Sequence, residues 1–108
     1  MKLPALLLLS ATCLWGLSPT AHAQKDTSAS LFHKRCAMCH GADGTGHTPA
    51  GKAFKAVDYH DPEVLKMSDA ELAAIIRTGK EKMPAFGSKL SASDIDSLVA
   101  YIHTLQKK

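Results

Sequence analysis

One five-residue motif, Cys36-Ala37-Met38-Cys39-His40, constrains the fold of this 108-residue chain more than any other feature. Two thiols three positions apart, followed directly by a histidine, form the attachment signal for c-type haem. The thiols add to the two vinyl groups of the porphyrin, and the histidine is then held against one face of the ring, where its imidazole can ligate iron. The motif therefore predicts one covalently bound haem c, with thioethers at Cys36 and Cys39 and an axial iron ligand at His40.

The first 23 residues have the pattern of a secretory signal. Lys2 gives a positively charged start, residues 3–17 are mostly apolar, and Ala21-His22-Ala23 has the small-x-small pattern of a cleavage site. We expect cleavage after Ala23. The sequence thus predicts a signal peptide over residues 1–23, export across the inner membrane and a periplasmic location.

Residues 24–108 are expected to form one monohaem domain. An uncleaved membrane anchor is a weaker alternative, because the apolar run is shorter than the about 20 residues that a membrane span needs. Lipid modification of Cys13 is another weak alternative, since Ser10-Ala11-Thr12 is a poor context for it. Membrane contact is therefore expected at most through a redox partner.

The charge and size of the mature chain narrow the class of protein further. The formal net charge of +3 falls by one when Lys2 is removed, and two haem propionates would bring the protein close to neutral. This balance gives no reason to expect nucleic-acid binding. A domain this small buries only about 60% of its unfolded surface and is marginally stable alone. A buried porphyrin would supply both apolar core and a covalent cross-link.

The residue pattern predicts helices and no strand. A first helix, beginning near Asp26 or Ser28, carries Phe32 and Cys36 one turn apart on the same face. The segment from Gly41 to Lys66 shows little periodicity, apart from a possible short helix at Asp61-Pro62. We expect this segment to wrap around the bound ring.

Two later helices begin with capping boxes, in which a serine side chain and an acid three residues on cap each other's backbone. One starts at Ser68 with Glu71, and Gly79 lies where a left-handed residue ends a helix. The other starts at Ser91 with Asp94 and continues with apolar residues at helical spacing.

Met83 is the best candidate for the second axial ligand. A thioether sulfur favours ferrous iron, and Pro84 restricts Met83 to extended backbone conformations. A core methionine that only fills a gap is the alternative. Further rivals are weaker: Met67 is expected to pack onto the following helix, and Met38 lies on the His40 side. The remaining histidines are His33, His47, His60 and His103, of which His47 and His60 are the serious rivals.

Two further expectations concern the surroundings of the iron. The second ring nitrogen of His40 needs a hydrogen-bond acceptor, and spacing suggests the backbone carbonyl of Pro49. Lysines near the haem edge either steer an acidic partner or form an ordinary solvated surface. These lysines are Lys52, Lys55, Lys80, Lys82 and Lys89.

The chain resembles the class I cytochromes c, specifically their short bacterial members, over nearly all of residues 24–108. The resemblance implies an all-α fold of three to four helices around one haem, with the first and last helices crossing near Phe32 and Tyr101. It also implies thioether attachment at Cys36 and Cys39 and axial ligation by His40 and Met83. The matching stretches are Leu31-Phe32, Cys36-Ala37-Met38-Cys39-His40-Gly41, Gly44-Thr45-Gly46, Ser68-Asp69-Ala70-Glu71-Leu72, Gly79-Lys80, Met83-Pro84-Ala85-Phe86-Gly87 and Leu98-Val99-Ala100-Tyr101-Ile102.

Three functions are compatible with these features. The leading hypothesis is a monomeric periplasmic single-electron carrier, not an enzyme, that exchanges electrons with a dehydrogenase, an oxidase or another cytochrome. The alternative is a haem enzyme or gas-binding protein with an open or labile sixth iron position. A redox dithiol or half of a zinc site is the third, but the chain has neither a βαβ context nor a second ligand pair.

Overall fold

The structure is a computed structural model that describes residues 1–4, 15–16 and 27–108. The predicted signal peptide and its cleavage after Ala23 lie almost wholly outside these residues. Within them the fold is all-α, as predicted, and the only β pairing is an isolated bridge between Lys80 and Met83. The helices are α1 (Ser28–Arg35), α2 (Ala37–His40), α3 (Pro49–Phe54), α4 (Pro62–Leu65), α5 (Asp69–Thr78) and α6 (Ala92–Gln106).

The first predicted helix is divided in two at the attachment motif. Helix α1 is capped by the Thr27 side chain, which accepts a hydrogen bond from the backbone N–H of Ser30, and it ends at Arg35. Cys36 leaves helical geometry (φ −122°, ψ −37°), and α2 then forms a separate single turn. The two cysteines therefore lie on either side of a bend in the chain and not on one continuous helix.

Helix α3 was not predicted, and it lies within the segment expected to have little regular structure. The Thr48 side chain accepts a hydrogen bond from the backbone N–H of Gly51, and Pro49 occupies the first turn. A threonine directly before a proline is a recognisable helix start, so the signal was present in the sequence. Lys55 ends α3 in a left-handed conformation (φ 56°). With the extra short helices, the described residues form six helical segments where three to four were expected.

Both predicted capping boxes are present. Ser68 and Glu71 cap the start of α5 reciprocally, and Ser91 and Asp94 do the same for α6. Gly79 follows α5 with φ 75°, as expected for the residue that ends the helix.

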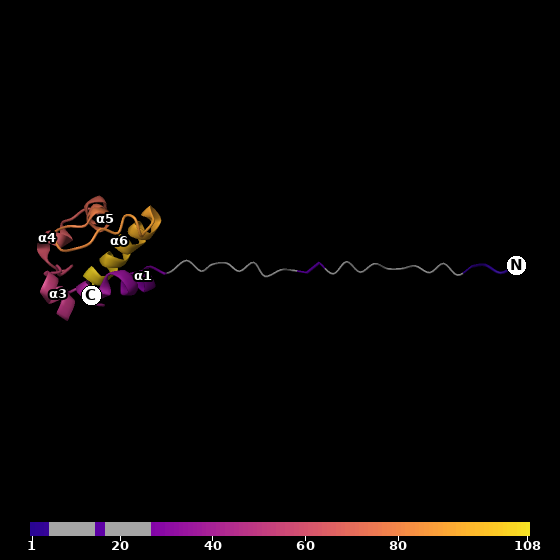
Figure 1. The fold of residues 1–108 in the computed structure, drawn as a ribbon, viewed down its shortest axis with the longest axis horizontal. Coiled ribbons are helices and arrows are strands. Elements are labelled where there is room, and N and C mark those ends of the chain that lie inside the picture. Colours follow the sequence, from indigo (N-terminus) through magenta and orange to yellow (C-terminus); the bar gives the residue numbers. More distant parts are fainter. Residues whose placement is uncertain (5–14, 17–26) are drawn as a thin grey trace.

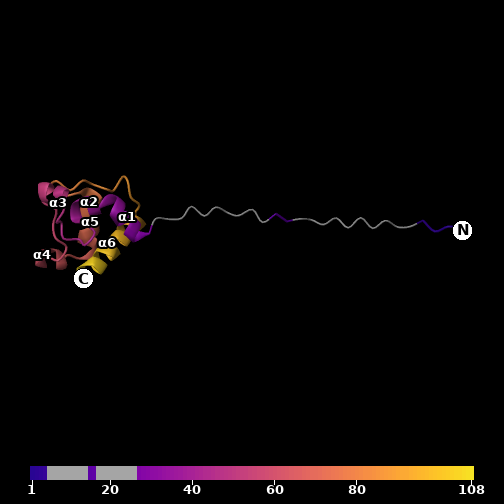
Figure 2. The same ribbon diagram turned by 90° about the horizontal axis from the view of Figure 1, so that it is seen from below.

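The core lies where α1 and α5 pack against α6. Figures 1 and 2 both show α1 beside α6, so the two ends of the described domain lie together. Phe32 is fully buried and its ring centroid lies 5.1 Å from that of Tyr101, which confirms the predicted crossing. The buried hydrophobic residues are Leu31, Phe32, Tyr59, Val64, Leu72, Ala73, Ile76, Phe86, Leu90, Ile95, Leu98, Val99, Ile102 and Leu105.

Candidate functional site

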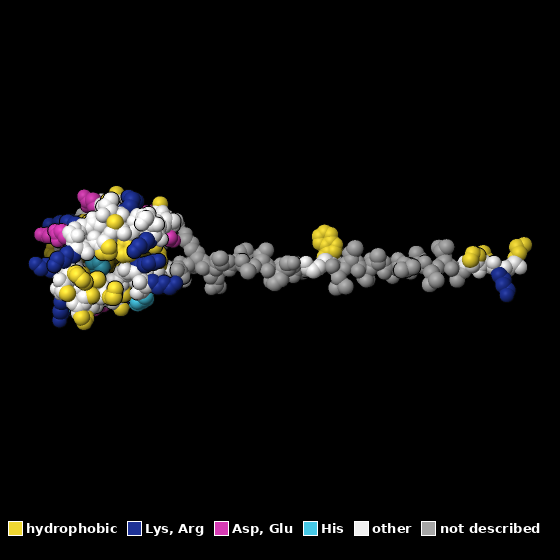
Figure 3. Space-filling model, viewed as in Figure 1, with side chains coloured by type: hydrophobic (Ala, Val, Ile, Leu, Met, Phe, Trp, Pro, Cys, Tyr) yellow, Lys and Arg dark blue, Asp and Glu magenta, His cyan; other side chains and the backbone are white. Residues whose placement is uncertain are grey.

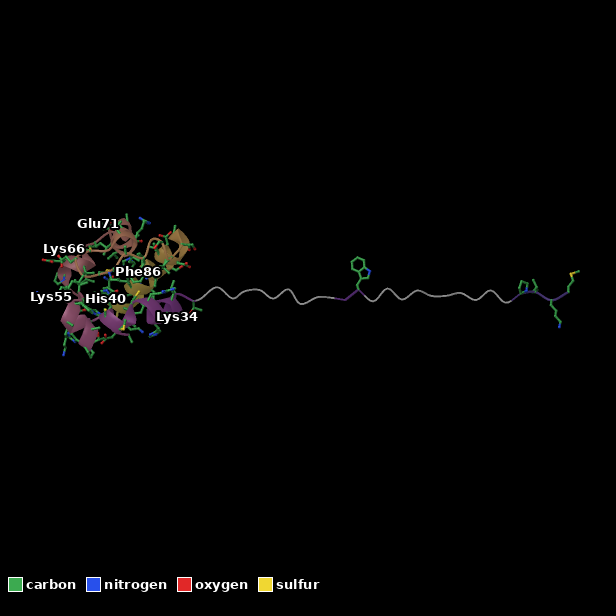
Figure 4. All side chains as sticks on the ribbon, viewed as in Figure 1. Lys34, His40, Lys55, Lys66, Glu71 and Phe86 are labelled. Carbon is green, nitrogen blue, oxygen red and sulfur yellow. The ribbon has the colours of Figure 1, made fainter. Side chains whose placement is uncertain are left out.

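A cleft of about 420 Å³ opens in the middle of the domain, and we call it the central cleft. Its walls come from the α1–α2 junction, from the segment after α3, from α5 and from the loop after α5. Figure 4 shows His40 in this region, with Lys34, Lys55 and Phe86 around it. The residues predicted to hold a haem all line this one cleft: Cys36, Cys39, His40 and Met83.

The two cysteines present free, half-buried thiols to the central cleft. Burial raises the pKa of the Cys36 thiol to about 11, although the nearby positive charge of Arg35 opposes this shift and Cys39 adds to it. Redox-active dithiols instead have a lowered thiol pKa. The surroundings of Cys36 thus disfavour the redox-dithiol interpretation of the motif.

His40 is buried and fixed by two contacts. Its Nδ1 lies 3.3 Å from the backbone oxygen of Val57, and its ring stacks on Tyr59 with centroids 4.7 Å apart and planes 20° apart. Burial lowers the pKa of the imidazole, with the hydrogen bond to Val57 acting in the opposite direction. Burial therefore favours the neutral ring, which is the form that binds metal.

His40 lines the central cleft, and its other ring nitrogen has no hydrogen-bond partner in the residues that the structure describes, so it is free to bind a ligand there. Among the described residues, every fully buried side-chain nitrogen or oxygen has a hydrogen-bond partner. The bonded nitrogen of His40 is Nδ1, with the backbone carbonyl as acceptor. With the proton on Nδ1, the lone pair of Nε2 is available to a ligand in the cleft.

The predicted Pro49 partner of His40 is wrong. Pro49 begins α3, and this helix start is tied to the backbone of α2 instead. The Thr48 hydroxyl lies 2.7 Å from the carbonyl oxygen of Met38 and 3.0 Å from that of Cys39. The chain passes Pro49 and returns to His40 only at Val57, a contact across 17 residues that spacing alone does not reveal.

Met83 is held on a short loop that is pinned at both ends. Its backbone pairs with that of Lys80 through hydrogen bonds of 2.9 and 3.2 Å, with Glu81 left-handed in the turn between them (φ 53°). The backbone N–H of Phe86 then bonds the carbonyl of Ile76 in α5 at 3.0 Å. Met83 is half-buried and packs against the core.

The rival sulfur and nitrogen ligands differ in their surroundings. Met38 and Met67 also line the central cleft, but Met38 is 76% exposed. His60 is hydrogen-bonded to Asp58 and to the Leu105 carbonyl, away from the cleft lining. His103 is similarly bonded to Asp69 and Gln106, and His47 is exposed. Met67 is the one rival that shares both the cleft and contact with the core.

The donor set in the cleft fits a c-type haem. Two thiols can form thioethers, an imidazole nitrogen and a thioether sulfur can ligate iron, and the remaining wall is largely apolar. No cluster of three or more metal-binding His, Cys, Asp or Glu side chains occurs among the described residues, so the zinc interpretation has no second ligand pair there.

Comparison with known proteins identifies the family. The family described as "Cytochrome C oxidase, cbb3-type, subunit III" matches residues 23–102, which include the attachment motif and Met83. This chain belongs to the small class I c-type cytochromes. Like the family, the cytochrome carries covalently bound haem c with iron.

Individual relatives agree with this assignment. The cytochrome is 35% identical over 86 residues to cytochrome c6 of a Nostoc species, an alignment that covers 79% of this chain and 74% of the relative. It is 33% identical to the cbb3-type cytochrome c oxidase subunit FixP of Azorhizobium caulinodans, covering 85% of this chain but only 31% of that subunit. The solved structure of the KustC0563 c-type cytochrome superposes with a TM-score of 0.68 at 29% identity, covering 75% of this chain and 99% of that one.

These relatives support the role of a haem c electron carrier for the cytochrome. None of the helices in the described part of the chain has the length and apolar character needed to cross a membrane.

Two residues that sequence reasoning missed, Val57 and Tyr59, make the contacts of His40. Tyr59 was visible as one of few aromatic residues, whereas nothing in the sequence marked Val57.

Proposed function

We propose that this cytochrome is a periplasmic single-electron carrier, and not an enzyme, whose haem is attached at Cys36 and Cys39 and ligated by His40 and Met83. The observation that carries the proposal is that these four side chains line one central cleft. If His40 and Met83 both bind the iron, no open site would remain for a substrate. The haem, when bound, supplies an iron that gains and loses one electron.

The residues of the chain set the conditions for that transfer. The Val57 carbonyl and the Tyr59 ring hold His40 in one orientation and tautomer. The Met83 thioether stabilises the reduced state and so raises the reduction potential. Because the loop around Met83 is hydrogen-bonded to α5 through Phe86, it would hold the sulfur in place for iron in either oxidation state.

Ligation by Met83 is tested with ferric absorption spectra and a redox titration. The native protein should show a weak near-infrared sulfur-to-iron band. Met83→Ala should lose this band, lower the reduction potential and admit exogenous imidazole. The matched control is Met67→Leu, which removes the rival sulfur from the same cleft and should keep the band and the potential.

A high-spin ferric spectrum of the native protein would contradict the carrier function and favour a haem enzyme or gas-binding protein with an open sixth position. Loss of the band in Met67→Leu, with Met83→Ala unaffected, would assign the ligand to Met67 instead.

The charges around the central cleft support an acidic redox partner, such as an acidic surface of a dehydrogenase, an oxidase or another cytochrome. Five basic side chains line the cleft, and Glu81 is the only carboxylate among its lining residues. Figure 3 shows Lys and Arg side chains on both sides of the domain in this view. Lys52 and Lys89, which the sequence also suggested, are not among the lining residues. The basic residues are Lys34, Arg35, Lys55, Lys80 and Lys82.

Docking at this face predicts a specific salt dependence. Lys80→Glu with Lys82→Glu should slow electron transfer to an acidic acceptor protein at low salt, and the difference from native should shrink as salt rises. The control, Lys107→Glu with Lys108→Glu, makes the same charge change at the end of the chain, beyond α6, and should have a smaller effect. Equal slowing by both pairs would show that net charge acts without a defined docking face.

Export and attachment are tested together by haem staining of the denatured protein. Deletion of residues 2–23 should abolish covalent haem, because thioether attachment of this kind takes place after export. Replacing both Cys36 and Cys39 by alanine in the full chain should also abolish holoprotein. Covalent haem in the cytoplasm of cells that make the deletion variant would contradict the periplasmic location.

A further inference from the structure

His60 joins two parts of the domain that are far apart in the sequence. Its Nδ1 lies 2.7 Å from Oδ1 of Asp58, and its Nε2 lies 3.0 Å from the backbone oxygen of Leu105 near the end of α6. Carboxylate and carbonyl oxygens are both acceptors, so both ring nitrogens must donate. The arrangement of both bonds therefore requires the protonated, positively charged imidazole.

The segment that His60 ties to α6 is the segment that holds His40. Residues 57–60 include the Val57 carbonyl, which bonds Nδ1 of His40, and the Tyr59 ring, which stacks on it. A second bond supports the same junction, because the Gln106 side chain donates to the Tyr59 carbonyl at 3.1 Å. We call this set of hydrogen-bonded residues the proximal clamp: Asp58, Tyr59 and His60 of the segment, and Leu105 and Gln106 of α6.

The charges around His60 favour its protonated form. The hydrogen bonds from the ring to Asp58 and to the Leu105 carbonyl raise the pKa of His60, and the charges of Asp58 and Asp43 act in the same direction. In turn, His60 lowers the pKa of Asp58, with a smaller contribution from His47. Partial burial of the ring opposes the shift.

We propose that His60 is a positioning residue for His40: when protonated it locks the 57–60 segment to α6, and its loss of a proton loosens the contacts of His40 and lowers the reduction potential. The inference rests on the proposed ligation by His40. A neutral His60 has one N–H and can keep only one of its two bonds, so the junction is held less firmly. Loss of the positive charge on His60 also stabilises ferric iron relative to ferrous iron, which lowers the reduction potential.

The proposal predicts linkage between the electron and the His60 proton. The reduction potential of the holoprotein should fall as pH rises through the pKa of His60. By reciprocity, NMR titration should give a higher His60 pKa in the ferrous than in the ferric protein. The signal of the His40 Nδ1 proton, which reports the hydrogen bond to Val57, should shift over the same pH range.

Three variants distinguish the effect of the His60 hydrogen bonds from the effect of its positive charge. His60→Gln should remove this pH dependence of the potential, whereas His33→Gln, at an exposed histidine of α1, should leave it as in the native protein. His60→Lys keeps a positive charge but cannot bridge two acceptors with a planar ring. Its His40 Nδ1 proton signal should therefore match that of His60→Gln at every pH.

The contrary results distinguish failure of the clamp from failure of the proposed function. Equal His60 pKa values in the two oxidation states, or an unchanged titration in His60→Gln, would overturn the clamp. So would a His60→Lys protein whose His40 signal matches the native protein at low pH, because charge alone would then suffice. If the ferric protein shows no hyperfine-shifted His40 resonances at any pH, His40 is not a ligand, and the proposed function fails together with the clamp.

Discussion

Gly51 decides how closely α3 approaches the attachment motif. It is buried, and a Cβ placed there would collide with the backbone oxygens of Cys39 and Gly46. Neither oxygen belongs to a flexible side chain, so neither can move aside cheaply. The absence of a side chain at this one position therefore lets the α3 helix lie directly against α2.

Gly51→Ala is expected to destabilise the holoprotein by about 1–3 kcal/mol, the usual range for overpacking a tight contact. Urea unfolding followed by the haem absorption band gives the free energy of unfolding. Lys52→Ala, at the exposed neighbouring position in α3, is the control and should change it by less than about 0.5 kcal/mol. A Gly51→Ala protein as stable as native would mean that α3 can move away from α2 at little cost.

The residues of the site differ in how far they can be read from the sequence. The attachment motif is contiguous, so Cys36, Cys39 and His40 are expected to act together without knowledge of the fold. Met83 was favoured only because a haem motif precedes it and it lies on a loop next to Pro84, since most methionines are ordinary core residues. The partner of His40 was mispredicted because Val57 is brought to it by the path of α3 and not by a local pattern.

At the scale of helices, the two that begin with capping boxes were predicted, whereas α3 was missed although Thr48 and Pro49 mark its start. The capping boxes of α5 and α6 are made within three residues, so Ser68 and Ser91 mark the starts directly. The bend at Cys36 has no such local signal, because the periodicity of Phe32 and Cys36 continues through it. The starts of α5 and α6 were therefore predicted correctly, whereas the prediction of one continuous helix from α1 through Cys36 was wrong.

The N-cap of α6 should contribute measurably to the free energy of unfolding. Ser91→Ala removes the acceptor for the backbone N–H of Asp94, a bond of 3.0 Å, and should cost about 1 kcal/mol in the free energy of unfolding. The matched control is Ser97→Ala in the same helix. The Ser97 hydroxyl bonds the carbonyl of Ser93 at 2.9 Å inside the helix, and such bonds add little stability. If both substitutions had equal cost, loss of the cap would not explain the Ser91 effect.

At the scale of the whole domain, two histidines connect α6 to other parts of the chain. His60 ties its end to the 57–60 segment, and His103 ties it to the start of α5 through Asp69 at 2.6 Å. Hydrogen bonding to Asp69, and then to Gln106, raises the pKa of His103 above the ordinary value of a histidine. A raised pKa in the folded protein means that folding is favoured by protonation.

The resulting pH dependence has a defined sign. The contributions of His60 and His103 are complete below about pH 6.5 and are lost as pH rises through their higher pKa values in the folded protein. Asp43 and Asp58, whose pKa values are lowered by hydrogen bonds, contribute above about pH 4 and lose this contribution in acid. The thermal midpoint should therefore be highest between these limits.

Thermal unfolding of His103→Gln at several pH values tests this account. The variant should melt below the native protein at pH 5.5, and the gap should narrow as pH rises through the raised pKa of His103. Asp69→Asn should narrow it in the same way, because it removes the other partner. A gap that stays constant with pH would show that His103 stabilises the fold through packing alone.

The crossing of α1 and α6 also dictates the order in which the domain can be completed. Phe32 packs on Tyr101, so this contact forms only after nearly the whole chain has been synthesised. Until then the central cleft lacks Ile102, the residue that α6 contributes to its lining. The cleft that holds the four candidate haem-binding residues is therefore completed late, because its lining includes Ile102 of the last helix.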